Sequence, residues 1–115
     1  MKKNEFVLVI DSNNQHLVVE PVEREDGGTL GLEFFLDKLD CKYIDIVRYG
    51  KYDIYVDDEG MYNSPNRGFV IDGNIQLFGN AVVCMSDREG NSIGFDSVDD
   101  MPTINITDWF FSLSF

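Results

Sequence analysis

The feature that most constrains the fold is a self-complementary segment in the middle of the chain, YIDIVRYGKYDIYV (43–56). Gly50 and Lys51 suit a two-residue hairpin loop, because a type II′ turn favours glycine in its first central position. The resulting register places opposite charges and aromatic residues across from each other: Tyr49 with Tyr52, Arg48 with Asp53, Val47 with Ile54, Ile46 with Tyr55, and Asp45 with Val56. Such cross-strand pairs stabilise a sheet. The sequence therefore predicts a β-hairpin over residues 42–57.

Short apolar runs elsewhere predict further strands. Residues 5–10 (EFVLVI) have the Val- and Ile-rich composition of a central strand. Residues 17–20 are predicted to return beside it, with Pro21 ending the strand, and the polar segment 23–28 is predicted to be a loop. Four more strands, bounded by Gly, Asp and Asn turn signals, are predicted at residues 68–71, 74–77, 80–85 and 91–95.

One segment has helical periodicity. In residues 29–39 (TLGLEFFLDKL), apolar side chains recur at i, i+3, i+4 and i+7, namely Leu32, Phe35, Leu36 and Leu39. Thr29 is a suitable N-cap residue. We therefore expect a single domain spanning residues 1–115 with an α+β fold. It would contain a small, mostly antiparallel curved sheet, or alternatively a partly open barrel, with one main helix packed on it.

The last twenty residues (96–115) give mixed signals. Residues 97–100 suit a short helical turn before Pro102, and the rest is predicted to be either helical or extended. This tail is aromatic, with Trp109, Phe110, Phe111 and Phe115 close together. It would either dock into the core or form an exposed apolar patch that mediates a homodimer.

The charge balance limits the classes of partner. Twenty-one acidic residues face nine basic ones, for a formal net charge of −12. Direct binding to nucleic acid or to an anionic membrane surface is disfavoured, because both need Lys and Arg. The acidic surface serves either solubility alone or a basic protein partner. The N-terminal apolar run ends after five residues, at Asp11, which is too short for a signal peptide or a membrane span. We expect a cytoplasmic protein whose two cysteines, Cys41 and Cys84, are free thiols.

Motifs for catalysis, metals and cofactors are weak. Gly27–Gly31 opens the helix, but no Lys follows as a phosphate-binding loop requires. The acidic residues lack the spacing of a calcium-binding loop, and one histidine (His16) with two separate cysteines does not suit zinc. Cys84 lies in an apolar run, where the pKa of a thiol rises. The sequence therefore predicts no catalytic residue, no cofactor and no metal site.

The segment YVDDEGMYNSPNRGF (55–69) contains three consecutive acidic residues followed by a polar run that ends in Arg67. Its acidic residues are predicted to form a hairpin turn in which Gly60 supplies a positive φ. A second turn is predicted at residues 63–66, and Arg67 is the cation that follows the acids. Together with the aromatic tail, this segment gives the candidate interaction surface: Asp57, Asp58, Glu59, Arg67, Trp109 and Phe110.

Six short elements follow one another along the chain: a strand start (6–10), a Leu-rich helix (32–39), an extended segment (44–47), an acidic turn (58–60), an Asn (Asn66), and a Gly followed by Val residues (79–83). This order resembles the DUF3846 family over about residues 5–95. Where the family often has glycines after the helix, this chain has Asp40-Cys41-Lys42. The resemblance implies a fold and an origin in phages, plasmids or gut-associated Firmicutes. It implies no activity and no site residues.

Two functions from different classes remain open. The first is a small acidic module that binds another macromolecule, a protein with a basic surface, without turnover. The alternative is a small-molecule binder or minor enzyme with a pocket between helix and sheet, lined by Tyr43, Tyr55, Tyr62 or Arg67.

Overall fold

The computed structural model describes residues 1–62 and 66–112 of the chain. Within these ranges the chain forms nine strands, one α-helix and two short 3-10 helices, η1 and η2. In chain order they are β1 (Lys2–Asp11), β2 (His16–Glu25), α1 (Leu32–Leu39), β3 (Ile44–Tyr49), β4 (Tyr52–Asp57), η1 (Gly60–Tyr62), β5 (Asn66–Ile71), β6 (Ile75–Phe78), β7 (Ala81–Ser86), β8 (Ser92–Ile93), η2 (Val98–Asp100) and β9 (Ile106–Ser112). The strands predicted downstream of the hairpin all form, with ends that differ from the prediction by at most two residues.

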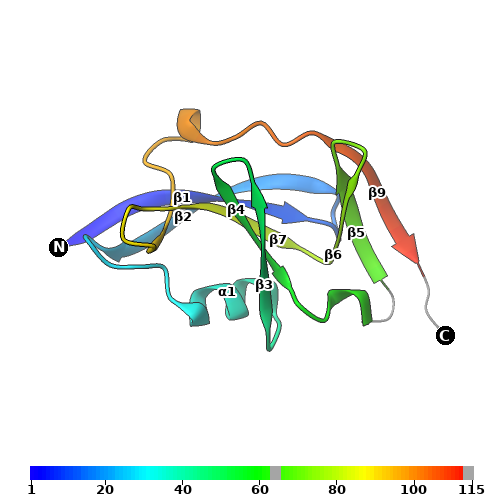
Figure 1. Cartoon of the computed structure of the whole chain (residues 1–115), viewed down its shortest axis with the longest axis horizontal. Helices are drawn as coiled ribbons and strands as arrows, with labels where there is room; N and C mark the ends of the chain where they lie inside the picture. Colours follow the sequence, from blue (N-terminus) through cyan, green and yellow to red (C-terminus); the bar gives the residue numbers. More distant parts are fainter. Residues whose placement is uncertain (63–65, 113–115) are drawn as a thin grey trace.

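The strands divide between two antiparallel sheets. The larger sheet has the order β2-β1-β7-β4-β3, with β8 also paired to β7, and the smaller sheet has the order β6-β5-β9. Figure 1 shows the smaller sheet at the right-hand end of the molecule and α1 below the larger sheet. The predicted α+β class is confirmed, whereas the barrel alternative is wrong because neither sheet closes on itself.

The larger sheet is buried on both faces, which explains the uninterrupted apolar runs of its central strands. Successive side chains of a strand point to opposite faces. In β1, Leu8 and Ile10 pack toward the smaller sheet, whereas Val7 and Val9 pack toward α1. β7 divides its side chains in the same way. The molecule therefore has three layers, in the order α1, larger sheet, smaller sheet.

The central hairpin has the predicted register. β3 and β4 pair residue for residue as the sequence indicates, from Tyr49 opposite Tyr52 to Asp45 opposite Val56. Gly50 has a φ of 62°, as the first central position of a type II′ turn requires. The register could be predicted because all the residues that pair in this hairpin lie within one segment of the chain, residues 42–57.

The helix is shorter than predicted, and one residue of its predicted apolar face, Leu32, is exposed, whereas Phe35 and Leu39 pack in the core as predicted. It begins at Leu32, and Gly31 occupies the N-cap position without a side-chain hydrogen bond. Thr29 is not the cap; its Oγ1 accepts the Ser92 N–H at 2.8 Å and so docks the preceding loop on β8. Leu32 is exposed, whereas Phe35 is buried in a stack on Tyr55, with ring centroids 3.7 Å apart.

The prediction that Pro21 ends its strand is wrong, because β2 continues to Glu25. The loop predicted at 23–28 is therefore confirmed only for residues 26–28. Pro21 lies opposite Phe6. Phe6 exchanges both backbone hydrogen bonds with Phe95, at 2.8 and 2.7 Å, on its other side. The Phe6–Pro21 pair therefore needs no hydrogen bond between β1 and β2. Since β2 is an edge strand, the missing N–H of proline costs no sheet bond.

The C-terminal tail is extended in its described part. β9 pairs with β5, and Trp109 packs against Phe69, with ring centroids 6.1 Å apart. The short turn predicted at 97–100 forms as η2, where Ser97 Oγ accepts the Asp99 N–H at 3.2 Å. Phe115 lies outside the described residues.

Candidate functional site

The acidic turn, Asp57–Glu59, connects the end of β4 to η1 and crosses from the larger sheet to the smaller one. Its shape is set by local hydrogen bonds: Asp57 Oδ1 accepts the Glu59 N–H at 2.9 Å, and the Asp58 N–H donates to Tyr43 O at 3.0 Å. Asp58 and Glu59 are exposed, and Asp57 is half-buried. The turn thus holds two carboxylates at the surface in a fixed backbone arrangement.

The turn is not the hairpin that the sequence predicts, since β4 pairs with β3 and β7 whereas β5 pairs with β6 and β9. Gly60 also differs from the prediction, because its φ lies outside the left-handed region. Gly60 is needed for another reason: a Cβ there would lie 3.1 Å from Phe78 O and 3.2 Å from Phe78 Cβ. The glycine allows η1 to pack closely on the end of β6. The second turn predicted at 63–66 falls largely on residues 63–65, outside the described part of the chain.

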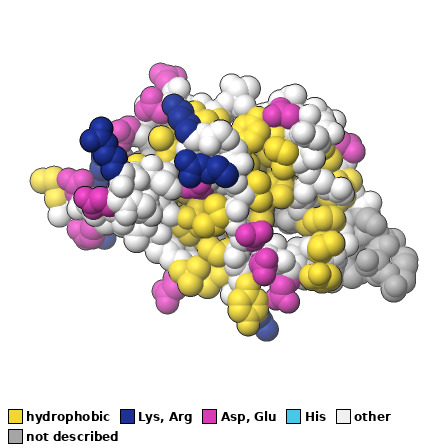
Figure 2. Space-filling model, viewed as in Figure 1, with side chains coloured by type: hydrophobic (Ala, Val, Ile, Leu, Met, Phe, Trp, Pro, Cys, Tyr) yellow, Lys and Arg dark blue, Asp and Glu magenta, His cyan; other side chains and the backbone are white. Residues whose placement is uncertain are grey.

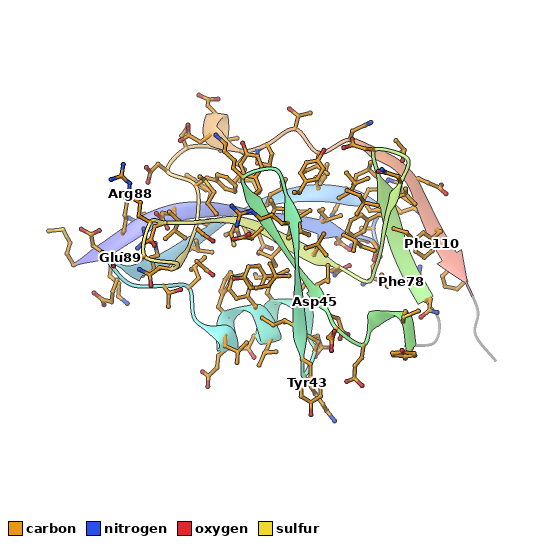
Figure 3. All side chains as sticks on the ribbon, viewed as in Figure 1. Tyr43, Asp45, Phe78, Arg88, Glu89 and Phe110 are labelled. Atoms are coloured by element: carbon orange, nitrogen blue, oxygen red, sulfur yellow. The ribbon has the colours of Figure 1, made fainter. Side chains whose placement is uncertain are left out.

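Exposed apolar side chains lie on either side of the acidic turn. Tyr43, whose carbonyl holds Asp58, is 61% exposed. On the other side, Met61 and Tyr62 in η1 are 52% and 77% exposed. We call Tyr43, Asp58, Glu59, Met61 and Tyr62 the acidic–aromatic face. Figure 2 shows acidic and hydrophobic side chains side by side in the lower centre of the molecule, and Figure 3 shows Tyr43 pointing outward there.

Asp57 and Arg67, which the sequence singles out separately, line one polar cleft of about 360 Å³. The cleft lies where several loops meet the C-terminal end of α1. Its lining also includes Lys38 and Asp40 from the helix end and Asn80 from the β6–β7 connection. Arg67 lies with its guanidinium carbon 4.4 Å from the ring centroid of Phe111. One of the predicted acids, Asp57, and the predicted cation Arg67 therefore line the same cleft.

The aromatic tail residues belong to a different part of the surface. Trp109 and Phe110 are both half-buried. Phe110 packs edge-on against Phe78, with ring centroids 5.4 Å apart, as Figure 3 illustrates for these two labelled residues. They contribute to packing in the smaller sheet, and Phe111 is the more exposed residue of this group, at 49%.

The interface between α1 and the larger sheet is filled with side chains. Tyr55, expected to line a pocket there, is buried beneath Phe35. Tyr43 and Tyr62 lie at the surface instead, and Arg67 lines the polar cleft beside Asp57.

The thiols and the histidine are far from a catalytic arrangement. Burial, with a contribution from Asp53, raises the pKa of Cys84 to about 12, so that this thiol stays protonated at neutral pH. His16 instead lies 3.3 Å from Asp11 in the β1–β2 turn. Both cysteines are free. In the part of the chain that the structure describes, no three His, Cys, Asp or Glu side chains are grouped so as to hold a metal ion.

Sequence reasoning missed a buried ion pair. Arg24 Nε and Nη2 donate to the two carboxylate oxygens of Glu5 at 2.7 and 2.9 Å, and both side chains are buried. The hydrogen bonds that Arg24 donates to Glu5 raise the pKa of Arg24. No local sequence pattern predicts this ion pair, because the two residues are brought together by the pairing of β1 with β2.

Comparison with known proteins gives a family and nothing more specific. No helix in the described ranges is long and apolar enough to cross a membrane. No curated protein and no solved structure matches the chain. A family model, described as a domain of unknown function (DUF3846), matches residues 1–104. This range contains every element up to η2 and leaves β9 outside. The chain therefore belongs to the DUF3846 family.

Proposed function

We propose that this protein is a binding module that recognises a basic surface of another protein through its acidic–aromatic face. The observation on which the proposal rests is that two exposed carboxylates, Asp58 and Glu59, lie between exposed Tyr43 on one side and exposed Met61 and Tyr62 on the other. Tyrosine and methionine are enriched in protein interfaces, where aromatic anchors supply most of the binding energy.

Charge supports the same type of partner. The chain has a net charge of −12, which speeds the approach of a basic protein and repels nucleic acid. Among the described residues, five side-chain cations pair with carboxylates of the same chain, namely Lys2, Lys3, Arg24, Lys38 and Arg48. We further propose a cytoplasmic location, which the two free thiols support. The resemblance of the sequence to proteins of mobile elements suggests a host protein that normally binds DNA as the class of partner.

The test is affinity capture from a bacterial cell extract with the tagged chain at low ionic strength. Two variants remove the two kinds of contact: Asp58→Asn/Glu59→Gln and Tyr43→Ser/Tyr62→Ser. Glu33→Gln/Asp37→Asn removes the same charge as the first variant from exposed positions of α1. We expect both face variants to lose the captured protein by about fivefold or more and the α1 variant to retain it.

The dependence of capture on salt concentration distinguishes a contact between charges from purely apolar binding. Contacts between exposed charges weaken as the Debye length falls from about 30 Å at 0.01 M to about 8 Å at 0.15 M. Capture should therefore decrease over this range. Capture that is equal for all variants, or that does not change with salt, would contradict the proposed function.

A further inference from the structure

A second cavity, a groove of about 500 Å³, lies away from the acidic–aromatic face. It is bounded by the start of β1, the tip of the β3–β4 hairpin and η2. In Figure 1, η2 is the orange turn above the hairpin tip. Ligand sites typically have volumes of about 300–1,000 Å³.

A buried aromatic ring lies beneath this groove and is rigidly held. Phe95 is 1% exposed, and its ring lies 5.8 Å from that of Tyr52. Two backbone hydrogen bonds tie Phe95 to Phe6 in β1. The segment that carries Phe95 can lie this close to β1 because residue 94 is a glycine: a Cβ on Gly94 would lie 2.7 Å from Phe6 O and 2.9 Å from Glu5 Cβ. The side chains of Met85 and Met101 complete an adaptable apolar surface.

At the rim of the groove, carboxylates outnumber lysines. Lys3 pairs with Asp96 at 3.4 Å, and Lys51 places its ammonium nitrogen 5.6 Å from the ring centroid of Tyr52. The carboxylates of Asp99 and Asp100 also line the groove, and neither makes a side-chain hydrogen bond or ion pair with the described residues. The groove thus offers two unpaired carboxylates and an aromatic ring that already contacts a cation.

We propose that this groove binds an alkylguanidinium or alkylammonium group, with the aliphatic stem on Met85 and Met101, above the buried Phe95 ring, and the cationic head at Asp99 and Asp100. Carboxylates and aromatic faces are the two groups that bind such cations. In the free protein, Lys51 occupies part of this groove, beside the ring of Tyr52. The site is separate from the acidic–aromatic face and does not depend on the proposed function.

The experiment is an NMR titration of the ¹⁵N-labelled full chain with butylguanidinium, followed at the amide of Gly94. n-Butanol serves as the neutral analogue. We expect saturable shifts with butylguanidinium and none with n-butanol. Asp99→Asn/Asp100→Asn should weaken binding by roughly fivefold or more, through loss of two charge-assisted contacts. Glu33→Gln/Asp37→Asn, with the same loss of charge on α1, should leave the affinity unchanged.

A second comparison tests the role of Lys51. Lys51→Ala should strengthen binding more than Lys2→Ala does, although both changes remove one positive charge. A blocked Gly-Arg-Gly peptide, titrated in parallel, distinguishes the source of the cation: tighter binding than butylguanidinium indicates a side chain of a protein, and weaker binding indicates a free small cation. Absence of saturable shifts up to millimolar concentrations, or equal weakening by the Asp99/Asp100 and Glu33/Asp37 variants, would overturn the proposal.

Discussion

Close packing in the smaller sheet requires a glycine at position 68. Gly68 lies in the central strand β5, where a Cβ would be 2.2 Å from Leu77 O and 2.5 Å from Phe110 Cζ. The missing side chain lets the Phe110 ring pack directly on the backbone. Overpacking of this kind typically costs about 1–3 kcal/mol. We expect Gly68→Ala to lower the free energy of unfolding by this amount in chemical denaturation.

Gly31→Ala is the matched control for Gly68→Ala. A Cβ at Gly31 meets no atom within 4 Å, and the φ of −73° at this residue suits alanine. A Gly68→Ala protein that is as stable as Gly31→Ala would show that the ring does not pack on β5 in this way.

Asp87 makes the stability of the β7–β8 turn depend on pH. Its Oδ1 accepts the N–H groups of Glu89 and Asn91, both at 2.9 Å, and its Oδ2 accepts Asn91 Nδ2 at 3.0 Å. These bonds, led by the Asn91 side chain, lower the pKa of Asp87 from 3.8. Because the pKa is lower in the folded chain than in the unfolded chain, ionised Asp87 stabilises the fold above pH 3.8, and this contribution is lost as the pH falls through the folded-state pKa.

The corresponding measurement is the melting temperature of Asp87→Ala and wild type across pH. We expect the variant to melt lower near neutral pH and the difference to shrink below pH 3.8. Glu89→Ala changes a carboxylate at an exposed position of the same turn, labelled in Figure 3, and should show no such convergence. A difference for Asp87→Ala that is constant with pH would contradict the role of its charge.

At the scale of elements, β3 is an edge strand that is protected by its own side chain. The Ile46 N–H donates to Asp45 Oδ1 at 2.9 Å, and the Ile46 side chain is 50% exposed. Figure 3 labels Asp45 on β3. Unprotected edges with apolar side chains invite pairing with another chain. We expect Asp45→Ala to self-associate with increasing concentration in light scattering.

Asp45→Asn separates the hydrogen bond from the charge. It keeps the Oδ1 acceptor and loses the negative charge, so we expect it to stay at the molecular weight of wild type. Equal association of the Ala and Asn variants would show that repulsion by charge, and not the covered N–H, protects this edge.

The elements that could be predicted from the sequence are those whose partners are near in the chain. The β3–β4 hairpin is the best example, since its pairing residues and its turn glycine are contiguous. The continuation of β2 past Pro21 could not be predicted, because it depends on Phe6 bonding to Phe95 on the far side of β1. The role of Gly60 was missed for the same reason: the atom that requires a glycine belongs to Phe78, eighteen residues later in the chain.

The candidate site was predictable in part. Acidic residues in a turn are visible in the sequence, and Asp58 and Glu59 are indeed exposed. The exposure of Tyr43 and Tyr62 was not predictable, because tyrosines in or beside β-strands are as often buried, as Tyr55 is here. Only the three-dimensional arrangement shows that these tyrosines flank the acids.

At the scale of the whole molecule, two acidic surfaces lie on different parts of one small fold. The three layers bury the apolar side chains of the larger sheet on both faces, and the loops between elements carry the exposed carboxylates. With a net charge of −12, nonspecific attraction to any basic protein is expected over the entire surface. The central claim is more specific: one face, with its tyrosines, makes the contact.

Site-specific photo-cross-linking in living bacteria tests this claim most directly. A photoreactive phenylalanine analogue replaces Tyr62 in one protein and Val98 in another, two exposed apolar positions on different surfaces, 77% and 51% exposed. We expect irradiation to give a discrete adduct from position 62 that is lost when Asp58→Asn/Glu59→Gln is added, and no adduct from position 98. No adduct from position 62, or the same adduct from both positions, would contradict the account.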